Sequence, residues 1–104
     1  MKGMEHYDLV VPEDVSAELA ARVRNLRLMR KWKQSTLAAR AGVSLASLRR
    51  FEQTGLVSLK NLLRLSFALG RLGDYDELLQ PPAAESLAAL EALVERPRRK
   101  RGSE

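Results

Sequence analysis

Apolar residues recur at helical spacing along much of the chain. Val15, Leu19, Val23 and Leu26 are separated by four, four and three residues, which predicts the buried stripe of a helix over about residues 14–31. Apolar positions predict three further helices, over about residues 34–41, 45–53 and 59–69, and a possible cap at Asp74 predicts a short fifth helix over 75–79. The pattern therefore predicts an all-α core of five helices.

Residues that begin and end helices stand between these segments. Gly42 can end the second helix in the left-handed conformation that glycine adopts at little cost. Ser44, Ser58 and Asp74 can cap the third, fourth and fifth helices. Pro81 and Pro82 should then stop the fifth helix. The second and third helices are thus expected to be joined by a turn of three residues.

The two ends of the chain suggest separate segments around a central domain over residues 13–80. Residues 1–12 include Tyr7–Val11, rich in β-forming residues, which is either a short strand paired with its copy in a dimer or a disordered arm. Residues 81–104 are expected to form a linker, a short helix over 84–95 and a basic tail.

Charge is strongly segregated although the net charge of the chain is only +5. Residues 19–71 hold twelve Lys or Arg against the single acid Glu52, whereas residues 72–95 hold six acids and no base. The helical middle should therefore present a densely positive face, for which nucleic acid is the obvious counterpart. The alternative is a solvated basic surface. The tail over 96–104 suits either nonspecific DNA contact or solubility.

The sequence lacks most of the residue types that catalytic and metal-binding sites use. The chain has no cysteine and a single histidine, His6, so we expect no catalytic site, no cofactor and no metal site. Asp74, Asp76 and Glu77 fit the capped start of a helix better than a metal site. With only five aromatic residues the core should be aliphatic, and Trp32 is expected to belong to it.

No segment resembles a membrane span or a signal peptide. No run approaches the length of about 18 apolar residues that a span needs, and the first residues lack the basic-then-apolar order of a leader. We therefore expect a cytoplasmic protein without a membrane partner.

The predicted third helix has two distinct faces. Leu48 and Phe51 set its buried side. Its outer side carries Ala46, Arg49, Arg50 and Gln53. A short helix that follows a three-residue turn and presents adjacent arginines outward fits the major groove of DNA.

The run QSTLAARAGVSLASLRRFE, from Gln34 to Glu52, resembles the Cro/phage-repressor family of helix-turn-helix proteins, also called the xenobiotic-response-element (XRE) type. The matching residues are Gln34, Leu37-Ala38, Ala41-Gly42-Val43-Ser44, Leu48, Phe51 and Glu52. The resemblance extends over about Leu19–Leu79 and includes Ala68-Leu69-Gly70. It implies a lambda-repressor-like fold and a homodimeric repressor on pseudopalindromic double-stranded DNA, associated with the nucleoid when bound.

The resemblance also implies which residues face DNA. These are Lys33, Gln34, Ser44, Leu45, Ala46, Ser47, Arg49 and Arg50. Gln34 would contact a phosphate at a helix N-terminus, and Arg50 would read guanine through its two-pronged guanidinium. Lys33 departs from the family pattern because it cannot cap the second helix, although it lies where a phosphate would pass. Leu45 and Ala46 replace polar readers, so specificity should rest partly on DNA shape.

Arg27 and Glu52 are expected to form an ion pair. Arg27 lies at the margin of the first helix's apolar stripe, and Glu52 is the only acid of the basic segment. Both also match positions that form a partly buried pair between the first and third helices of the resembling family.

A looser resemblance links residues 62–82 to HipB-like antitoxin regulators encoded beside HipA-like kinases. It rests on Leu62, Leu63, Ala68-Leu69-Gly70, the acidic turn, Leu78-Leu79 and Pro81-Pro82. It implies the autoregulating antitoxin of a toxin-antitoxin operon, with residues 72–95 or the tail as partner surfaces. The alternative is a protein-binding antitoxin module that neutralises a HipA-like kinase toxin, with DNA binding secondary.

Overall fold

The computed structural model describes residues 11–95. The proposed strand or arm over residues 1–12 lies outside the described residues except for its last two, and the basic tail lies wholly outside them. The described chain divides between Asp74 and Tyr75 into two units, and each is described by itself.

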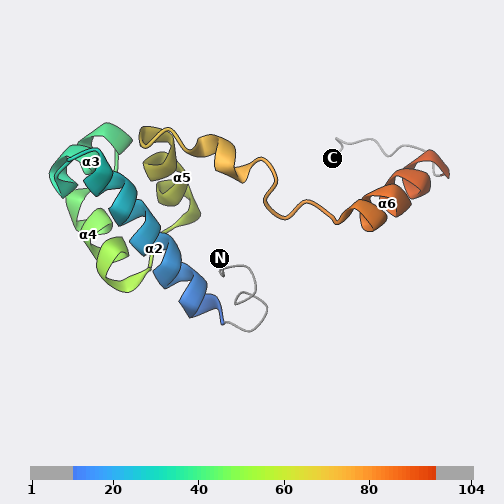
Figure 1. Cartoon of the computed structure of the whole chain (residues 1–104), viewed down its shortest axis with the longest axis horizontal. Helices are drawn as coiled ribbons and strands as arrows, with labels where there is room; N and C mark the ends of the chain where they lie inside the picture. Colours follow the sequence, from blue (N-terminus) through green and yellow to red (C-terminus); the bar gives the residue numbers. More distant parts are fainter. Residues whose placement is uncertain (1–10, 96–104) are drawn as a thin grey trace. The chain divides into compact units, whose positions relative to one another are not determined.

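The described elements are all helical, which confirms the predicted fold class (Figure 1). They are α2 (Pro12–Met29), α3 (Gln34–Ala41), α4 (Leu45–Thr54), α5 (Leu59–Ala68), the 3-10 helix η1 (Leu72–Tyr75) and α6 (Ala83–Glu95). The first unit holds α2 to α5 and most of η1, and the second holds α6.

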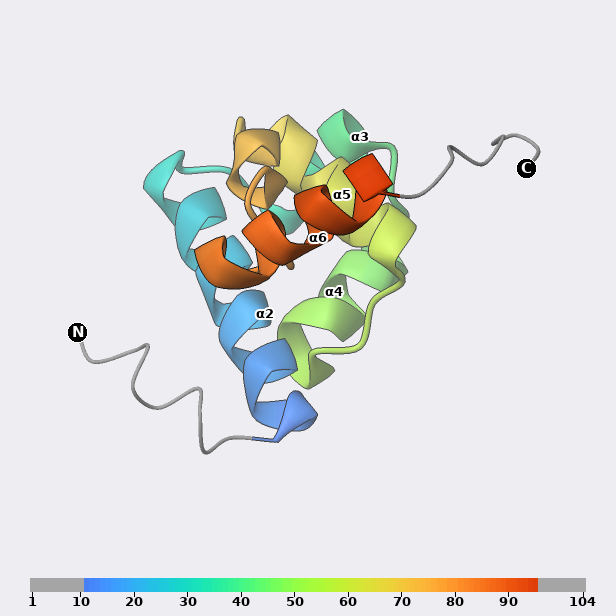
Figure 2. The ribbon, with the colours of Figure 1, turned by 90° about the vertical axis from the view of Figure 1, so that its right-hand side faces the viewer.

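The core of the first unit lies between α2, α3, α4 and α5. α2 packs against α4, and α3 packs against both α4 and α5 (Figure 2). Five side chains are almost completely buried: Phe51, Leu37, Leu48, Leu65 and Leu69. Phe51 is the only aromatic residue among the buried core residues, as expected from the composition. Trp32 is only half buried and packs against the edge of this core.

α2 begins and ends two residues before the predicted 14–31. Pro12 stands in its first turn, where its fixed φ suits a helix, and Glu13 and Asp14 follow near the positive end of the helix dipole. The helix ends at Met29 because Lys31 adopts a left-handed φ of 59°.

The prediction of a helix over residues 75–79 is wrong. The structure has η1 at Leu72–Tyr75 instead, followed by turn residues 76–79. Asp74 lies inside η1 and pairs with Arg71 at 2.9 Å rather than capping a helix. Pro81 and Pro82 leave too few residues to repay the cost of nucleating a helical turn after Tyr75.

The second unit contains α6, close to the predicted 84–95. Its large apolar side chains are exposed: Leu87, Leu90, Leu93 and Val94. None of the helices between residues 11 and 95 is both long and apolar enough to cross a membrane.

Candidate nucleic-acid interface

The turn between α3 and α4 has the predicted three residues. Gly42 ends α3 with a φ of 70°, and Val43 is buried, with its N–H donating to Ala38 O at 3.0 Å. Ser44 then caps α4, since its Oγ accepts from the N–H of Ser47 at 3.1 Å. The two helices are therefore held at a fixed angle by one left-handed glycine, one buried valine and one cap.

α4 presents an exposed face of mixed size and charge. Leu48 and Phe51 are buried beneath it. The exposed side chains are Ala46, Arg49, Arg50 and Gln53, which is the division that the spacing predicted. Leu45 and Ser47 are half buried, and Leu45 packs against the core.

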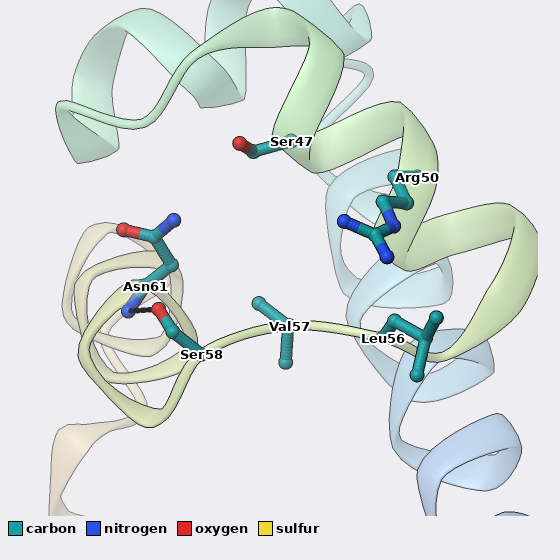
Figure 3. Close-up of a pocket in the computed structure, with 6 residues that line it drawn as sticks. All are labelled: Ser47, Arg50, Leu56, Val57, Ser58 and Asn61. Carbon is teal, nitrogen blue, oxygen red and sulfur yellow. Dashed lines mark hydrogen bonds between the residues drawn. The ribbon is translucent and has the colours of Figure 1, made fainter.

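Arg50 lies in an open groove of about 400 Å³ between α4 and the start of α5. The groove is lined by Ser47, Arg50, Leu56, Val57, Ser58 and Asn61. Figure 3 shows Arg50 on α4 and Asn61 on α5 facing this space from two sides. Ser58 Oγ caps α5 by accepting from Asn61 N–H at 3.1 Å, so the amide of Asn61 stands at a helix N-terminus that favours anions.

The second wall of the groove, formed by the start of α5, was not among the residues expected from the sequence to face DNA. Ser58 was identified only as a cap, and Asn61 was not singled out. The available signal was a single amide, Asn61, in the first turn of an otherwise leucine-rich helix. Its position opposite Arg50 depends on the path of the loop from Gly55 to Ser58, which helical spacing does not predict.

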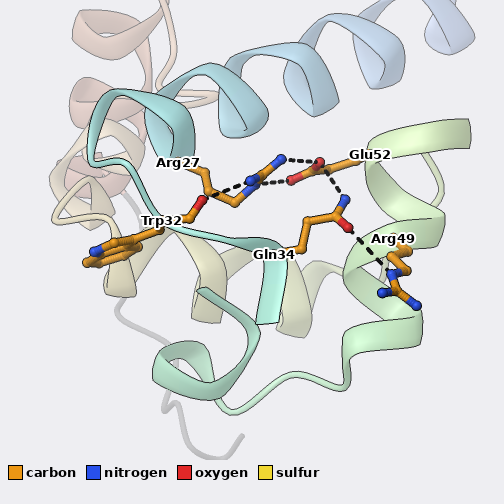
Figure 4. A network of polar contacts seen from close by, with 5 residues as sticks. All are labelled: Arg27, Trp32, Gln34, Arg49 and Glu52. Carbon is orange, nitrogen blue, oxygen red and sulfur yellow. Dashed lines mark hydrogen bonds and ion pairs between the residues drawn. The ribbon is translucent and has the colours of Figure 1, made fainter. Parts of the chain in front are cut away.

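A buried polar network connects α2, α3 and α4 (Figure 4). Arg27 and Glu52 form the expected ion pair with two hydrogen bonds, Nε to Oε2 at 2.9 Å and Nη2 to Oε1 at 3.0 Å. Arg27 Nη1 also donates to Trp32 O at 2.9 Å. The two side chains are only 8% and 3% exposed, so the pair is shielded from water.

Gln34 extends this network to the exposed face of α4. Its Nε2 donates to Glu52 Oε1 at 2.9 Å, and its Oε1 accepts from Arg49 Nε at a long 3.4 Å. The side chain expected to contact phosphate is thus turned toward Glu52 and Arg49. One N–H of its amide and the backbone N–H groups of Gln34 and Ser35 remain for an anion, whereas the N–H of Thr36 already donates to Lys33 O at 3.0 Å.

Lys33 precedes α3 in an extended conformation and makes no side-chain cap, as its chemistry predicted. Nearby, Arg30 and Arg40 lie over the ring of Trp32, with guanidinium carbons 5.1 and 4.6 Å from the ring centre. The turn from α2 to α3 is therefore basic, and the indole that packs against the core also carries two cations on its ring.

The acidic residues of the turn after α5 form no metal site. Among residues 11–95 no group of three or more acidic or histidine side chains is close enough to hold a metal ion.

The comparisons agree with this geometry. The helix-turn-helix family model matches residues 23–74, which is half of the chain. Searches of curated proteins and of solved structures returned no match. The matched residues include the whole of α3, the turn, α4 and α5. The chain belongs to the helix-turn-helix family of DNA-binding transcription regulators.

Proposed function

We propose that the protein is a sequence-specific transcriptional repressor that binds its operator as a homodimer, with α4 in the major groove. The observation that carries this proposal is the exposure of Arg49 and Arg50 on a helix whose other face is fixed in the core. Because α4 is anchored by Leu48 and Phe51, its arginines are presented by a rigid support.

Two helix N-termini flank α4 in this arrangement. On one side are Lys33 and the first turn of α3, and on the other are Ser58 and Asn61 at the start of α5. Helix N-termini favour phosphate through their free N–H groups and their dipoles. We therefore assign the two sides to the two phosphate backbones and the exposed face of α4 to the base edges between them.

Arg50 is the principal base reader in this proposal. Its guanidinium shares the groove with Ser47 and Asn61, which gives it polar neighbours that can orient it. Arg49, in contrast, is drawn toward Gln34. Ala46 is small and exposed, so it allows close approach of the helix to the bases and contributes only apolar contact.

The test is a binding comparison on operator DNA selected from a random pool by the wild-type protein. Arg50→Ala should lower affinity for the selected sequence by about 5- to 150-fold, the equivalent of about 1–3 kcal/mol, and lower affinity for unrelated DNA much less. Arg24→Ala is the matched control, because Arg24 is an exposed arginine of α2 that does not line the groove beside α4. Equal losses for both variants on both DNAs would contradict base reading by Arg50.

The antitoxin role rests on the looser resemblance of residues 62–82 alone, and no relative supports it. It predicts that a HipA-like kinase encoded next to this gene binds the chain. Co-expression of the two followed by size-exclusion chromatography tests this directly, and a kinase that elutes alone would leave the DNA-binding function as the only one.

A further inference from the structure

α5 carries apolar side chains on two sides, of which one is buried in the core and the other is largely exposed. Leu65 and the capping Leu69 are buried in the core. Leu59, Leu63 and Phe67 follow one another at intervals of four residues, so they form a second strip along the helix. Leu59 is 66% exposed and Phe67 is 70% exposed, whereas Leu63 between them is half buried. We call these three residues the α5 strip; an apolar strip of this size marks a surface that another element covers.

The α5 strip has a basic margin. At 100° per residue, Lys60 and Arg64 lie on the edge next to Phe67, and both are exposed. Within residues 11–95 neither side chain forms an ion pair. An element that covers the strip therefore gains most if it brings acidic side chains to this edge.

α6 has the complementary pattern. Leu87, Leu90 and Val94 share one face and are exposed, and Glu91 lies at the edge of that face. Residues 72–95 hold six acids and no base. α6 has 13 residues, and isolated helices shorter than about 12–15 residues are only marginally stable in water. α6 therefore needs a surface to pack on.

Charge distinguishes between the three ways in which α5 and α6 of two copies of the chain could pair. Two α5 strips facing each other would bring the margins of Lys60 and Arg64 together, and two α6 faces would bring together their acids, including Glu91. Only α5 against α6 joins apolar surface to apolar surface with opposite charges along the edge.

We propose that α6 of a second copy packs on the α5 strip, and that the exchange is reciprocal, so that it forms the homodimer. The linker favours exchange between copies. Leu79 holds a left-handed φ of 61° and is 93% exposed, and Pro81 and Pro82 keep the next residues extended. A short strained connection of this kind promotes exchange of an element between identical chains. This interface would be that of the homodimer in the proposed function, on which the inference rests.

The absence of native cysteine allows a direct test with introduced thiols. Full-length Phe67→Cys and Leu90→Cys proteins are purified separately, mixed, and oxidised mildly. The expected product is a covalent dimer that contains one chain of each variant, identified by mass. The matched control pairs Phe67→Cys with Ala92→Cys, because Ala92 lies on the opposite side of α6, and it should yield at least tenfold less covalent dimer.

The other occupants of the strip give different products. Efficient coupling of Phe67→Cys to itself would show an α5–α5 interface, and a chain with both substitutions that closes only within itself would show that each α6 covers its own α5. Either product overturns the proposal, as does the lack of any coupling. Operator binding by the unoxidised variants is measured in parallel, so a dimer that binds DNA without this coupling would refute the inference and leave the proposed function intact.

Discussion

Removal of the Glu52 carboxylate is the sharpest test of how the two helices are held together. Glu52→Ala leaves the Arg27 guanidinium buried without its counter-charge, because Arg27 is only 7% exposed. Its remaining partner is Trp32 O, and a neutral carbonyl does not compensate a buried cation. The same change removes the acceptor of Gln34 Nε2.

The expected cost is large on the scale of a small domain. Breaking a buried ion pair from one side costs about 3–5 kcal/mol, out of a total stability of about 5–15 kcal/mol. For a domain of this size about 1 kcal/mol corresponds to roughly 4–8 °C in Tm. Glu52→Ala should therefore lower Tm by at least about 12 °C.

Circular dichroism at 222 nm during thermal and urea unfolding measures this loss. Glu18→Ala is the control, because it breaks the Arg22–Glu18 pair, whose side chains are 52% and 49% exposed, at a cost below about 1 kcal/mol. Arg27→Met combined with Glu52→Leu removes both charges and should be more stable than Glu52→Ala. If Glu52→Ala unfolded at the same temperature as Glu18→Ala, the buried pair would contribute no more than the exposed one, contrary to this prediction.

Three further outcomes are expected. Gly42→Ala should lower the free energy of unfolding by about 1 kcal/mol through its left-handed φ alone, since a Cβ there meets nothing within 4 Å. Gly55→Ala should lower it more, because a Cβ would lie 3.2 Å from Ser16 on α2. Urea midpoints that rank the two variants in the reverse order would contradict this. Ser44→Ala should cost about 1 kcal/mol by removing the cap of α4, with Ser44→Asp retaining most of the stability in the same assay. Deletion of residues 96–104 should reduce the slope of log K against log salt by about 0.9 for each phosphate that the tail neutralises, and an unchanged slope would assign the tail to another role.

Helical spacing predicted the four packed helices because each buries one stripe. The Leu48–Phe51 pair placed the buried side of α4 correctly. The intervals in α2 placed its buried side only in part, because Val23 is buried and Leu19 and Leu26 are half buried, but Val15 is exposed. The other buried residues of α2 are Ala20 and Arg27. Gly42 and Ser44 have strong local preferences, so the turn could also be predicted. The segment after α5 was predicted wrongly because Asp74 is equally suited to cap a helix or to pair with Arg71, and the structure has the pair.

The part of the candidate site that lies on α4 alone could be predicted from the sequence. The part that depends on how α4 and α5 are placed could not. Exposure of Arg49 and Arg50 follows from their spacing to Leu48 and Phe51. The contribution of Asn61 depends on the loop that joins α4 to α5, and no periodic signal describes that loop.

Gln34 makes the two neighbouring arginines unequal partners for a ligand. Arg49 Nε is shared with the Gln34 carbonyl across 3.4 Å, so a DNA contact that draws this nitrogen away leaves that carbonyl without its donor. The amide is held at its other end by Glu52, which only accepts, and it therefore cannot turn over to compensate. Recruiting Arg49 thus carries an enthalpic penalty that Arg50 does not incur, and sequence preference should be steeper at the base read by Arg50 than at the one beside it.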